Sequence, residues 1–72
     1  MSNVRDDLKL ARLSLGLSQH ALAQAAGVSR DTVRRLESGG GVNPGTAKRI
    51  GDILGLTPLQ VLGLPAPEGR AA

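Results

Sequence analysis

Apolar residues recur every three or four positions, the spacing of one helix face, in five segments of this 72-residue chain. The predicted helices are residues 4–15, 19–26, 29–38, 44–54 and 58–62. The positions expected to face a core are Leu8, Ala11, Leu15, Leu22, Ala23, Val33, Leu36, Ala47, Ile50, Leu54, Leu59 and Leu62. No segment alternates apolar and polar residues as a half-buried strand does. The pattern therefore predicts an all-α domain.

Residues that favour helix ends stand at the boundaries of these segments. The expected N-caps, whose side-chain oxygens accept hydrogen bonds from free backbone N–H groups, are Asn3, Ser18, Ser29, Asn43 and Thr57. Glycine tolerates the left-handed backbone that follows many helices, and the expected stops are Gly16, Gly27 and Gly55. A single domain is expected over residues 1–64, with a frayed start at residues 1–3. Residues 65–72 lack apolar periodicity and are expected to form a disordered tail.

Two features of this pattern have more than one interpretation. Leu10 and Leu13 fall off the inward face of the first helix, so they are either ordinary exposed leucines or a small partner-binding patch. Three consecutive glycines, at residues 39–41, indicate either a mobile connector or a place where the backbone closely approaches another group.

The composition excludes several classes of function. The chain has no cysteine, one histidine and no aromatic residue. Disulfides and thiolate metal sites are thereby ruled out, and no nucleophile–base or metal-ligand arrangement can be assembled. We therefore expect no enzymatic activity, no cofactor and no metal. The absence of aromatic rings also argues against a single-strand nucleic-acid binder, since such proteins stack bases on rings.

The positive charge is concentrated in one stretch. The formal net charge is +3, and residues 29–49 contain five basic and two acidic residues, whereas the remainder is balanced. This distribution is expected either of a surface that faces a polyanion or of a solvated charged face. No apolar run is long enough to span a bilayer, and residues 5–7 interrupt any signal-peptide-like segment. A cytoplasmic location is expected.

Residues 19–37 are predicted to form two helices joined by a tight turn at residues 26–28, the arrangement of a helix-turn-helix. The residues at the motif spacing are Gln19, Ala23, Gly27, Val33 and Leu36. The stretch LGLSQHALAQAAGVSRDTVRRLESG resembles the phage-repressor and Cro-type (xenobiotic-response-element) family, and PGTAKRIGDILGLTP continues the similarity. The resemblance covers residues 8–62. It implies a compact five-helix, lambda-repressor-like DNA-binding domain, with the helix-turn-helix formed by its second and third helices.

The resemblance also implies roles for individual residues. Residues 29–38 would form the recognition helix in the major groove, and the implied base-contacting residues are Ser29, Arg30, Asp31 and Arg35. The expected phosphate-contacting residues are Ser18, Gln19, Arg34, Ser38 and Asn43. Ser38 stands where the family usually has an asparagine. Arg12 and Glu37 match a salt bridge that joins the first helix to the end of the third.

Elementary chemistry supports some of these roles and leaves others open. Arginine can donate two parallel hydrogen bonds to guanine, so Arg30 and Arg35 are the best candidates for base contacts. Arg34 lies about 100° around the helix from Arg35 and is expected to meet phosphate or solvent. Asp31 has three interpretations: it accepts from cytosine, it orients a neighbouring arginine, or it stabilises the first helical turn.

Four further polar residues have two interpretations each. Thr32 either contacts a thymine methyl group or only shields the helix. The remaining three are either solvated or in contact with phosphate, namely His20, Lys48 and Arg49.

The expected partner is double-stranded DNA, which the protein would bind as a transcriptional regulator, in particular a repressor. The family often has basic residues after the third helix where this chain has glycines, so each monomer should bind weakly. A homodimer on a palindromic operator is therefore expected, with half-sites about 34–36 Å apart. The expected dimer interface is the helix at 58–62 together with the loop before residue 44, using Leu59 or Val61. Two alternatives are an antitoxin, which binds a toxin and regulates its own operon, and a domain excised from a longer repressor. The resemblance implies a bacterial or phage protein at the nucleoid.

Overall fold

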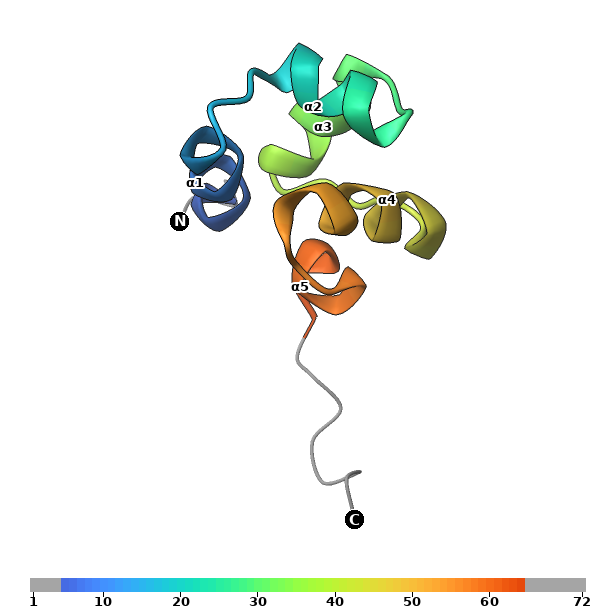
Figure 1. Cartoon of the computed structure of the whole chain (residues 1–72). Coiled ribbons are helices and arrows are strands. Elements are labelled where there is room, and N and C mark those ends of the chain that lie inside the picture. The colour runs from blue at the N-terminus through green and yellow to red at the C-terminus, as the bar shows by residue number, and fades with distance from the viewer. Residues whose placement is uncertain (1–4, 65–72) are drawn as a thin grey trace.

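The computed structural model describes residues 5–64, and it consists of helices and their connections over that range. The helices are α1 (Asp6–Ser14), α2 (Gln19–Ala26), α3 (Arg30–Glu37), α4 (Pro44–Leu54) and α5 (Pro58–Leu62). Helix α2 packs against both α3 and α4, α5 packs on α4, and α1 contacts α3. Figure 1 shows α2 and α3 together at one end, α4 and α5 below them, and α1 to one side. The predicted five-helix fold is confirmed.

Local capping explains most helix boundaries. The side-chain oxygens of Ser18, Ser29, Asn43 and Thr57 each accept a backbone N–H three residues further on, at 2.8–3.1 Å. Thr57 also donates its backbone N–H to Oε1 of Gln60 at 2.8 Å, which completes a capping box. The predicted bounds of α2, α4 and α5 are confirmed, and residues 29 and 38 are the caps of α3 rather than its ends.

The predicted start of the first helix is wrong. Helix α1 begins at Asp6, and Arg5 occupies the N-cap position without a side-chain hydrogen bond to the helix. The predicted cap Asn3 lies outside the described residues, as do residues 65–72, for which a disordered tail was predicted. Arg5 is held by tertiary bonds instead, since its backbone N–H donates to the carbonyl of Glu37 at 2.7 Å. This backbone hydrogen bond ties the start of α1 to the end of α3.

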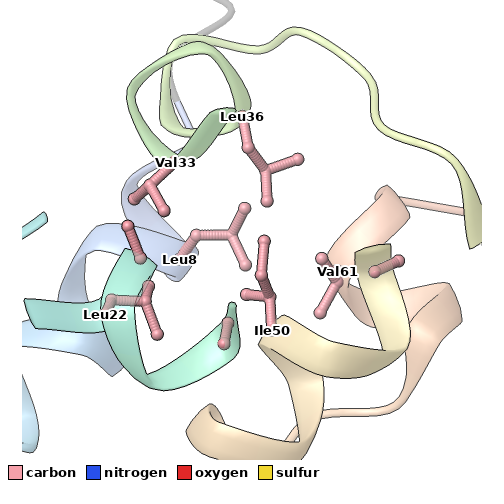
Figure 2. Packing of buried hydrophobic residues seen from close by; sticks show 9 residues of the cluster. Leu8, Leu22, Val33, Leu36, Ile50 and Val61 are labelled. Carbon is pink, nitrogen blue, oxygen red and sulfur yellow. The ribbon is translucent and has the colours of Figure 1, made fainter. Parts of the chain in front are cut away.

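One apolar cluster joins all five helices. Its buried members are Leu8, Leu22, Ala23, Ala26, Val33, Leu36, Ala47, Ile50 and Val61. Figure 2 shows the side chains of Leu8, Leu36 and Ile50 converging at its centre. Leu15 was predicted to face inward but is 52% exposed, because it follows the last residue of α1 and has left the helical path. Leu10 and Leu13 are exposed, and Leu54 and Leu62 are partly buried against the cluster.

Helix α5 presents a different residue to the core from those predicted. Val61 is fully buried and Leu59 is only partly buried, so Val61 is unavailable to the dimer interface for which it was considered. The reason is a tight junction between α4 and α5. The carbonyl of Gly51 accepts the N–H of Leu56 at 2.9 Å. A Cβ on Gly51 would lie 2.4 Å from the oxygen of Leu56 and 3.3 Å from Val61, so the missing side chain lets α5 fold back with Val61 inward.

The glycine segment after α3 makes a close backbone approach at its middle residue. The N–H of Gly40 donates to the carbonyl of Arg35 at 2.8 Å, and a Cβ on Gly40 would lie 2.9 Å from that oxygen. Gly39 has a left-handed φ of 98°. Nothing lies within 4 Å of a Cβ built on Gly41. Of the two interpretations of this segment, close approach applies at Gly40, where the group approached is the carboxyl end of α3.

Candidate nucleic-acid interface

Helices α2 and α3 are joined by a turn of defined geometry. Gly27 adopts a left-handed backbone with φ 72° and ψ 33°, and the N–H of Val28 donates to the carbonyl of Ala23 at 2.9 Å. Ala23 and Ala26 are buried and small, which lets the two helices approach closely. The chain then re-enters a helix at once, because Ser29 caps α3. These features produce the helix-turn-helix predicted for residues 19–37.

The inward side of α3 fixes which residues face outward. Val33, Leu36 and Glu37 are buried. With 3.6 residues per turn, Asp31 lies about 160° around the helix from Val33. Arg35 and Ser38 follow at the spacing of one helical face, and all three are exposed. We call Asp31, Arg35 and Ser38 the outer face of α3. This face has no packing role within the described domain and is the part of α3 that a groove can receive.

Two arginines of α3 keep their donors uncommitted. Arg30 and Arg35 are exposed, and within residues 5–64 neither side chain forms a hydrogen bond or an ion pair. A free guanidinium presents five N–H donors in a planar fork that matches the paired acceptors of guanine. Arg30 stands at the amino end of α3 and Arg35 lies on the outer face. Their availability is the geometry that the predicted base contacts require.

Asp31 and Arg34 form an ion pair on the surface of α3. The Nη2 of Arg34 donates to Oδ1 of Asp31, three residues earlier in the helix, and both side chains are well exposed. The hydrogen bond from Arg34 is the main cause that lowers the pKa of Asp31, and the charges of Arg34 and Arg35 act in the same direction. Asp31 therefore orients Arg34 in the free protein, one of the interpretations that the sequence left open. Its Oδ2 forms no hydrogen bond within the described part of the chain.

The amino end of α3 has one hydroxyl already in use. The Oγ of Ser29 accepts the N–H of Thr32 at 3.1 Å and lies 2.8 Å from Oγ1 of Thr32. Either hydroxyl can be the donor in the second contact. When Thr32 donates, the hydroxyl hydrogen of Ser29 is left for a base, and when Ser29 donates, a base contact requires that this bond be exchanged. Thr32 is half-buried, which agrees with the second of its two interpretations, that it only shields the helix.

The predicted phosphate-contacting residues differ in how free they are to donate. Ser18 and Asn43 use oxygen atoms as helix caps, so the hydroxyl hydrogen of Ser18 and the amide N–H₂ of Asn43 remain available. Ser38 already donates its hydroxyl to the carbonyl of Arg34 at 3.0 Å. Gln19 donates from Nε2 to Oε1 of Glu37 at 3.2 Å, and its second amide N–H is unused within residues 5–64.

Arg12 and Glu37 form the ion pair that the family resemblance implied. The Nε and Nη2 of Arg12 donate to the two carboxylate oxygens of Glu37 at 2.6 and 3.0 Å, and Nη1 donates to the carbonyl of Leu17 at 2.8 Å. Both side chains are buried, and the hydrogen bond to Glu37 raises the pKa of Arg12. With Gln19, the pair links α1 to the start of α2 and the end of α3. This buried network holds the helix-turn-helix against the rest of the domain.

Sequence reasoning missed the role of Arg5. Its Nη1 and Nη2 donate to the carbonyls of Val61 and Gln60 at 3.1 and 2.8 Å, and it is paired with Asp7. These carbonyls lie at the carboxyl end of α5, where helix carbonyls lack internal partners. No local signal in the sequence connects residues this far apart. The sequence shows only that Arg5 directly precedes two acidic residues, Asp6 and Asp7, which favours the ion pair with Asp7 but not the contact with α5.

The basic residues of α4 are arranged in two ways. Lys48 pairs with Asp52 at 3.1 Å on the exposed side of the helix. Arg49 is also exposed, and its Nη1 lies 4.0 Å from the position that a Cβ on Gly27 would occupy. Its guanidinium therefore lies beside the turn between α2 and α3, where it adds positive charge next to the amino end of α3.

The described residues offer neither a metal-binding cluster nor a membrane-spanning helix. Residues 5–64 contain no group of three or more histidine, cysteine or acidic side chains placed to hold a metal ion. None of the helices in that range is both long enough and apolar enough to cross a membrane.

Comparison with known proteins agrees with this geometry. A family model described as helix-turn-helix, of the Cro/C1 type, matches residues 8–62, which is more than half of the chain. Comparisons with curated proteins and with solved structures found no significant match. The matched range begins at the first core residue of α1 and ends with the last residue of α5.

Proposed function

The chain belongs to the Cro/C1-type helix-turn-helix family of DNA-binding regulators, and from this premise we propose that it represses transcription by occupying a specific operator. In the proposed complex α3 lies in the major groove of double-stranded DNA, with its amino end and outer face toward the base edges. A repressor of this kind acts by excluding other proteins from the DNA that it covers. No group in the proposed site takes part in a reaction.

The observation that supports this proposal is the pair of free arginines on α3. Within residues 5–64, Arg30 and Arg35 are exposed and form no hydrogen bond or ion pair, whereas Arg5 and Arg12 are hydrogen-bonded inside the fold. A bidentate contact from arginine to guanine is worth about 1–3 kcal/mol of discrimination. We assign Arg30 and Arg35 to guanines of the operator. Ser29 would contact a base through its hydroxyl group, which lies 2.8 Å from that of Thr32.

Phosphate contacts would fix the orientation of α3 in the groove. Asn43 and Ser18 stand at the amino ends of α4 and α2, where unpaired backbone N–H groups also favour an anion. Gln19, Ser38 and Arg34 complete the proposed set. Ser38 can contact a phosphate only after its hydroxyl releases the carbonyl of Arg34. Gln19 can use its second amide N–H or release the carboxylate of Glu37.

We propose that two copies bind a palindromic operator. Each chain offers a small set of charged phosphate contacts, because glycines occupy the segment after α3. Two linked copies contact two half-sites and gain affinity without further contacts per monomer. The surface proposed for dimerisation is α5 with the loop before α4. Leu59 is its apolar candidate, since Val61 belongs to the core.

Selection of bound duplexes from a random pool tests this function directly. The expected result is an enriched inverted repeat whose half-sites lie one helical turn apart. Arg30→Ala and Arg35→Ala should each weaken binding to that repeat by at least about tenfold and relax the preference at one base position. Lys9→Ala is the matched control, because it removes a positive charge from an exposed position on α1.

Two results would contradict the proposal. The first is failure of the wild-type protein to enrich any duplex. The second is retention of full affinity and the same sequence preference by both arginine variants, provided that thermal unfolding shows the variants to be folded.

A second candidate function is favoured by the exposed leucines of α1. Leu10 and Leu13 are exposed on α1, three residues apart on the helix. An antitoxin uses such a surface to bind a toxin while its helix-turn-helix represses the shared operon. Copurification of a small basic protein with the wild type, and its loss in a Leu10→Ser/Leu13→Ser variant that still binds DNA, would support this candidate.

A further inference from the structure

Asp31 is an anion on the surface of α3 that we propose to face DNA. It lies on the outer face of α3 together with Arg35, and its side chain is 58% exposed. When α3 enters the groove, a carboxylate in this position comes close to the DNA phosphates and is repelled by them. It therefore lowers the affinity for DNA unless it accepts a hydrogen bond from a base. The ion pair with Arg34 offsets its charge but occupies one of its two oxygens. Oδ2 remains able to accept a hydrogen bond, and the pairing of Oδ1 with Arg34 holds the carboxylate in one orientation.

The major groove offers few partners to an acceptor. Guanine presents N7 and O6 and thymine presents O4, all of which are acceptors and repel a carboxylate. Donors are limited to N4 of cytosine and N6 of adenine. Adenine places the acceptor N7 beside its donor, whereas cytosine has only a C–H group beside N4. Cytosine is therefore the base edge that best matches an ionised carboxylate.

The environment keeps this carboxylate ionised. Hydrogen bonding by Arg34, and the positive charges of Arg34 and Arg35, lower the pKa of Asp31. The side chain is therefore an acceptor without a donor hydrogen at neutral pH. Arg34 also restricts the rotation of the carboxylate, because the pair is formed three residues apart on one helix.

We propose that Asp31 selects cytosine at one position of each operator half-site, and that Arg34 is the residue that positions its carboxylate. The inference rests on the proposed function, since it names the base chemistry that the same surface recognises. It replaces the idea that Asp31 only stabilises the first turn of α3. In that simpler role the acid would affect helix stability but not base preference.

The test compares base preference in three proteins. Once the repeat is known, duplexes with each of the four bases at every half-site position are titrated with the wild type, D31N and D52N. The wild type should prefer cytosine at one position by about tenfold. D31N should lose this preference or shift it toward adenine, which an amide can contact through both its donor and its acceptor. D52N should match the wild type, because Asp52 is an equally exposed, paired acid on α4.

A modified base tests the contact with the wild-type protein alone. N4-methylcytosine keeps the hydrogen used for pairing but replaces the major-groove hydrogen by a methyl group. Placed at the selected position, it should weaken wild-type binding by about tenfold. The same base at another cytosine of the site should have little effect on wild-type binding. This arm does not depend on the folding of any variant.

The positioning role of Arg34 has its own readout. R34M should weaken the preference for cytosine at the position that Asp31 contacts, while preferences elsewhere remain unchanged. R34K retains the positive charge but not the planar fork of donors, so its preference for cytosine should lie between those of R34M and the wild type. Unchanged cytosine preference in R34M would overturn this role.

Failure of the inference and failure of the proposed function give different results. An enriched repeat that D31N and the wild type recognise with identical preferences, or that tolerates N4-methylcytosine at every position, overturns the inference alone. The absence of any enriched duplex for the wild type overturns the proposed function and, with it, the inference.

Discussion

Arg12 of α1 and Glu37 at the end of α3 form a bidentate ion pair in the interior of the domain. The donor–acceptor distances are 2.6 and 3.0 Å, and the side chains are only 7% and 8% exposed. Glu37 also accepts a hydrogen bond from Gln19, at the first position of α2. The pair therefore joins α1 to both helices of the helix-turn-helix, and it couples the stability of the fold to the placement of the DNA-binding surface.

Removing one member of this pair should be more harmful than removing both. Glu37→Leu leaves the Arg12 guanidinium buried and unpaired, which should lower the free energy of unfolding by about 3–5 kcal/mol. Arg12→Met/Glu37→Leu removes both charges and should be more stable than Glu37→Leu alone. Urea denaturation of both single variants and the double variant measures the coupling energy. Additive effects would show that the two residues stabilise the fold independently.

Gln19 and Arg34 should contribute to DNA binding in different ways. Gln19→Ala removes an uncharged donor, so affinity should fall for specific and unrelated duplexes while the salt dependence stays the same. Arg34→Met removes a charge, so the slope of log affinity against log salt should decrease by about one. Titrations at three or more salt concentrations distinguish the two. An altered slope for Gln19→Ala would show that it disturbs a charged contact.

Gly51 should be required for the junction between α4 and α5. Alanine is normally favoured over glycine inside a helix by about 1 kcal/mol. At Gly51 the added Cβ would lie 2.4 Å from the carbonyl oxygen of Leu56, which is backbone and cannot move aside cheaply. Gly51→Ala should therefore lower the melting temperature. Gly45→Ala in the same helix is the control, since its Cβ would make only an ordinary contact, at 3.5 Å, and should raise stability by about 0.5–1 kcal/mol. Equal effects of the two substitutions would contradict the steric explanation.

Asp7 should make the stability of the domain depend on acid pH. Arg5 donates to its two oxygens at 3.0 and 2.9 Å, and these hydrogen bonds lower the pKa of Asp7. Because the pKa is lower in the folded state, the stabilisation is complete above the unfolded value of about 3.9. It is lost as the pH falls through the folded-state pKa.

Asp7→Asn should therefore destabilise the protein near neutral pH but not in strong acid. The difference from wild type near pH 6 should be about 0.2–1 kcal/mol, as for other exposed ion pairs, and should vanish once the pH falls below the folded-state pKa of Asp7. Thermal unfolding across this range measures it. Asp6→Asn is the control, since Asp6 lies in the same first turn and makes no hydrogen bond with Arg5. A difference that persists unchanged in acid would mean that the effect is not electrostatic.

The candidate site was predictable where it depends on helix periodicity. Val33 and Leu36 define the inward side of α3, so the outward positions of Arg35 and Asp31 follow from 3.6 residues per turn. What periodicity does not give is the partner of each polar side chain. The pairing of Asp31 with Arg34 was one of several options, and the bond from Gln19 to Glu37 was not anticipated because its ends lie on different helices.

The sequence by itself determined the helices and most of their ends. Capping is a local interaction, in which Ser18, Ser29, Asn43 and Thr57 each satisfy an N–H group three residues away. Because the cap and the N–H group are only three residues apart, they come together whenever the helix forms, whatever the rest of the chain does. The bounds of α2, α4 and α5 could therefore be assigned before the fold was known.

Only the tertiary structure decided which long-range partners are used. Arg5 bonds to carbonyls of α5, and Val61 rather than Leu59 enters the core. Helix α5 is only five residues long, so its own apolar pattern is too short to define a face. Its orientation is set by packing against α4, where Val61 is fully buried and a Cβ on Gly51 would lie 3.3 Å from it. Contacts of this kind depend on the whole chain being packed, and no local spacing specifies them.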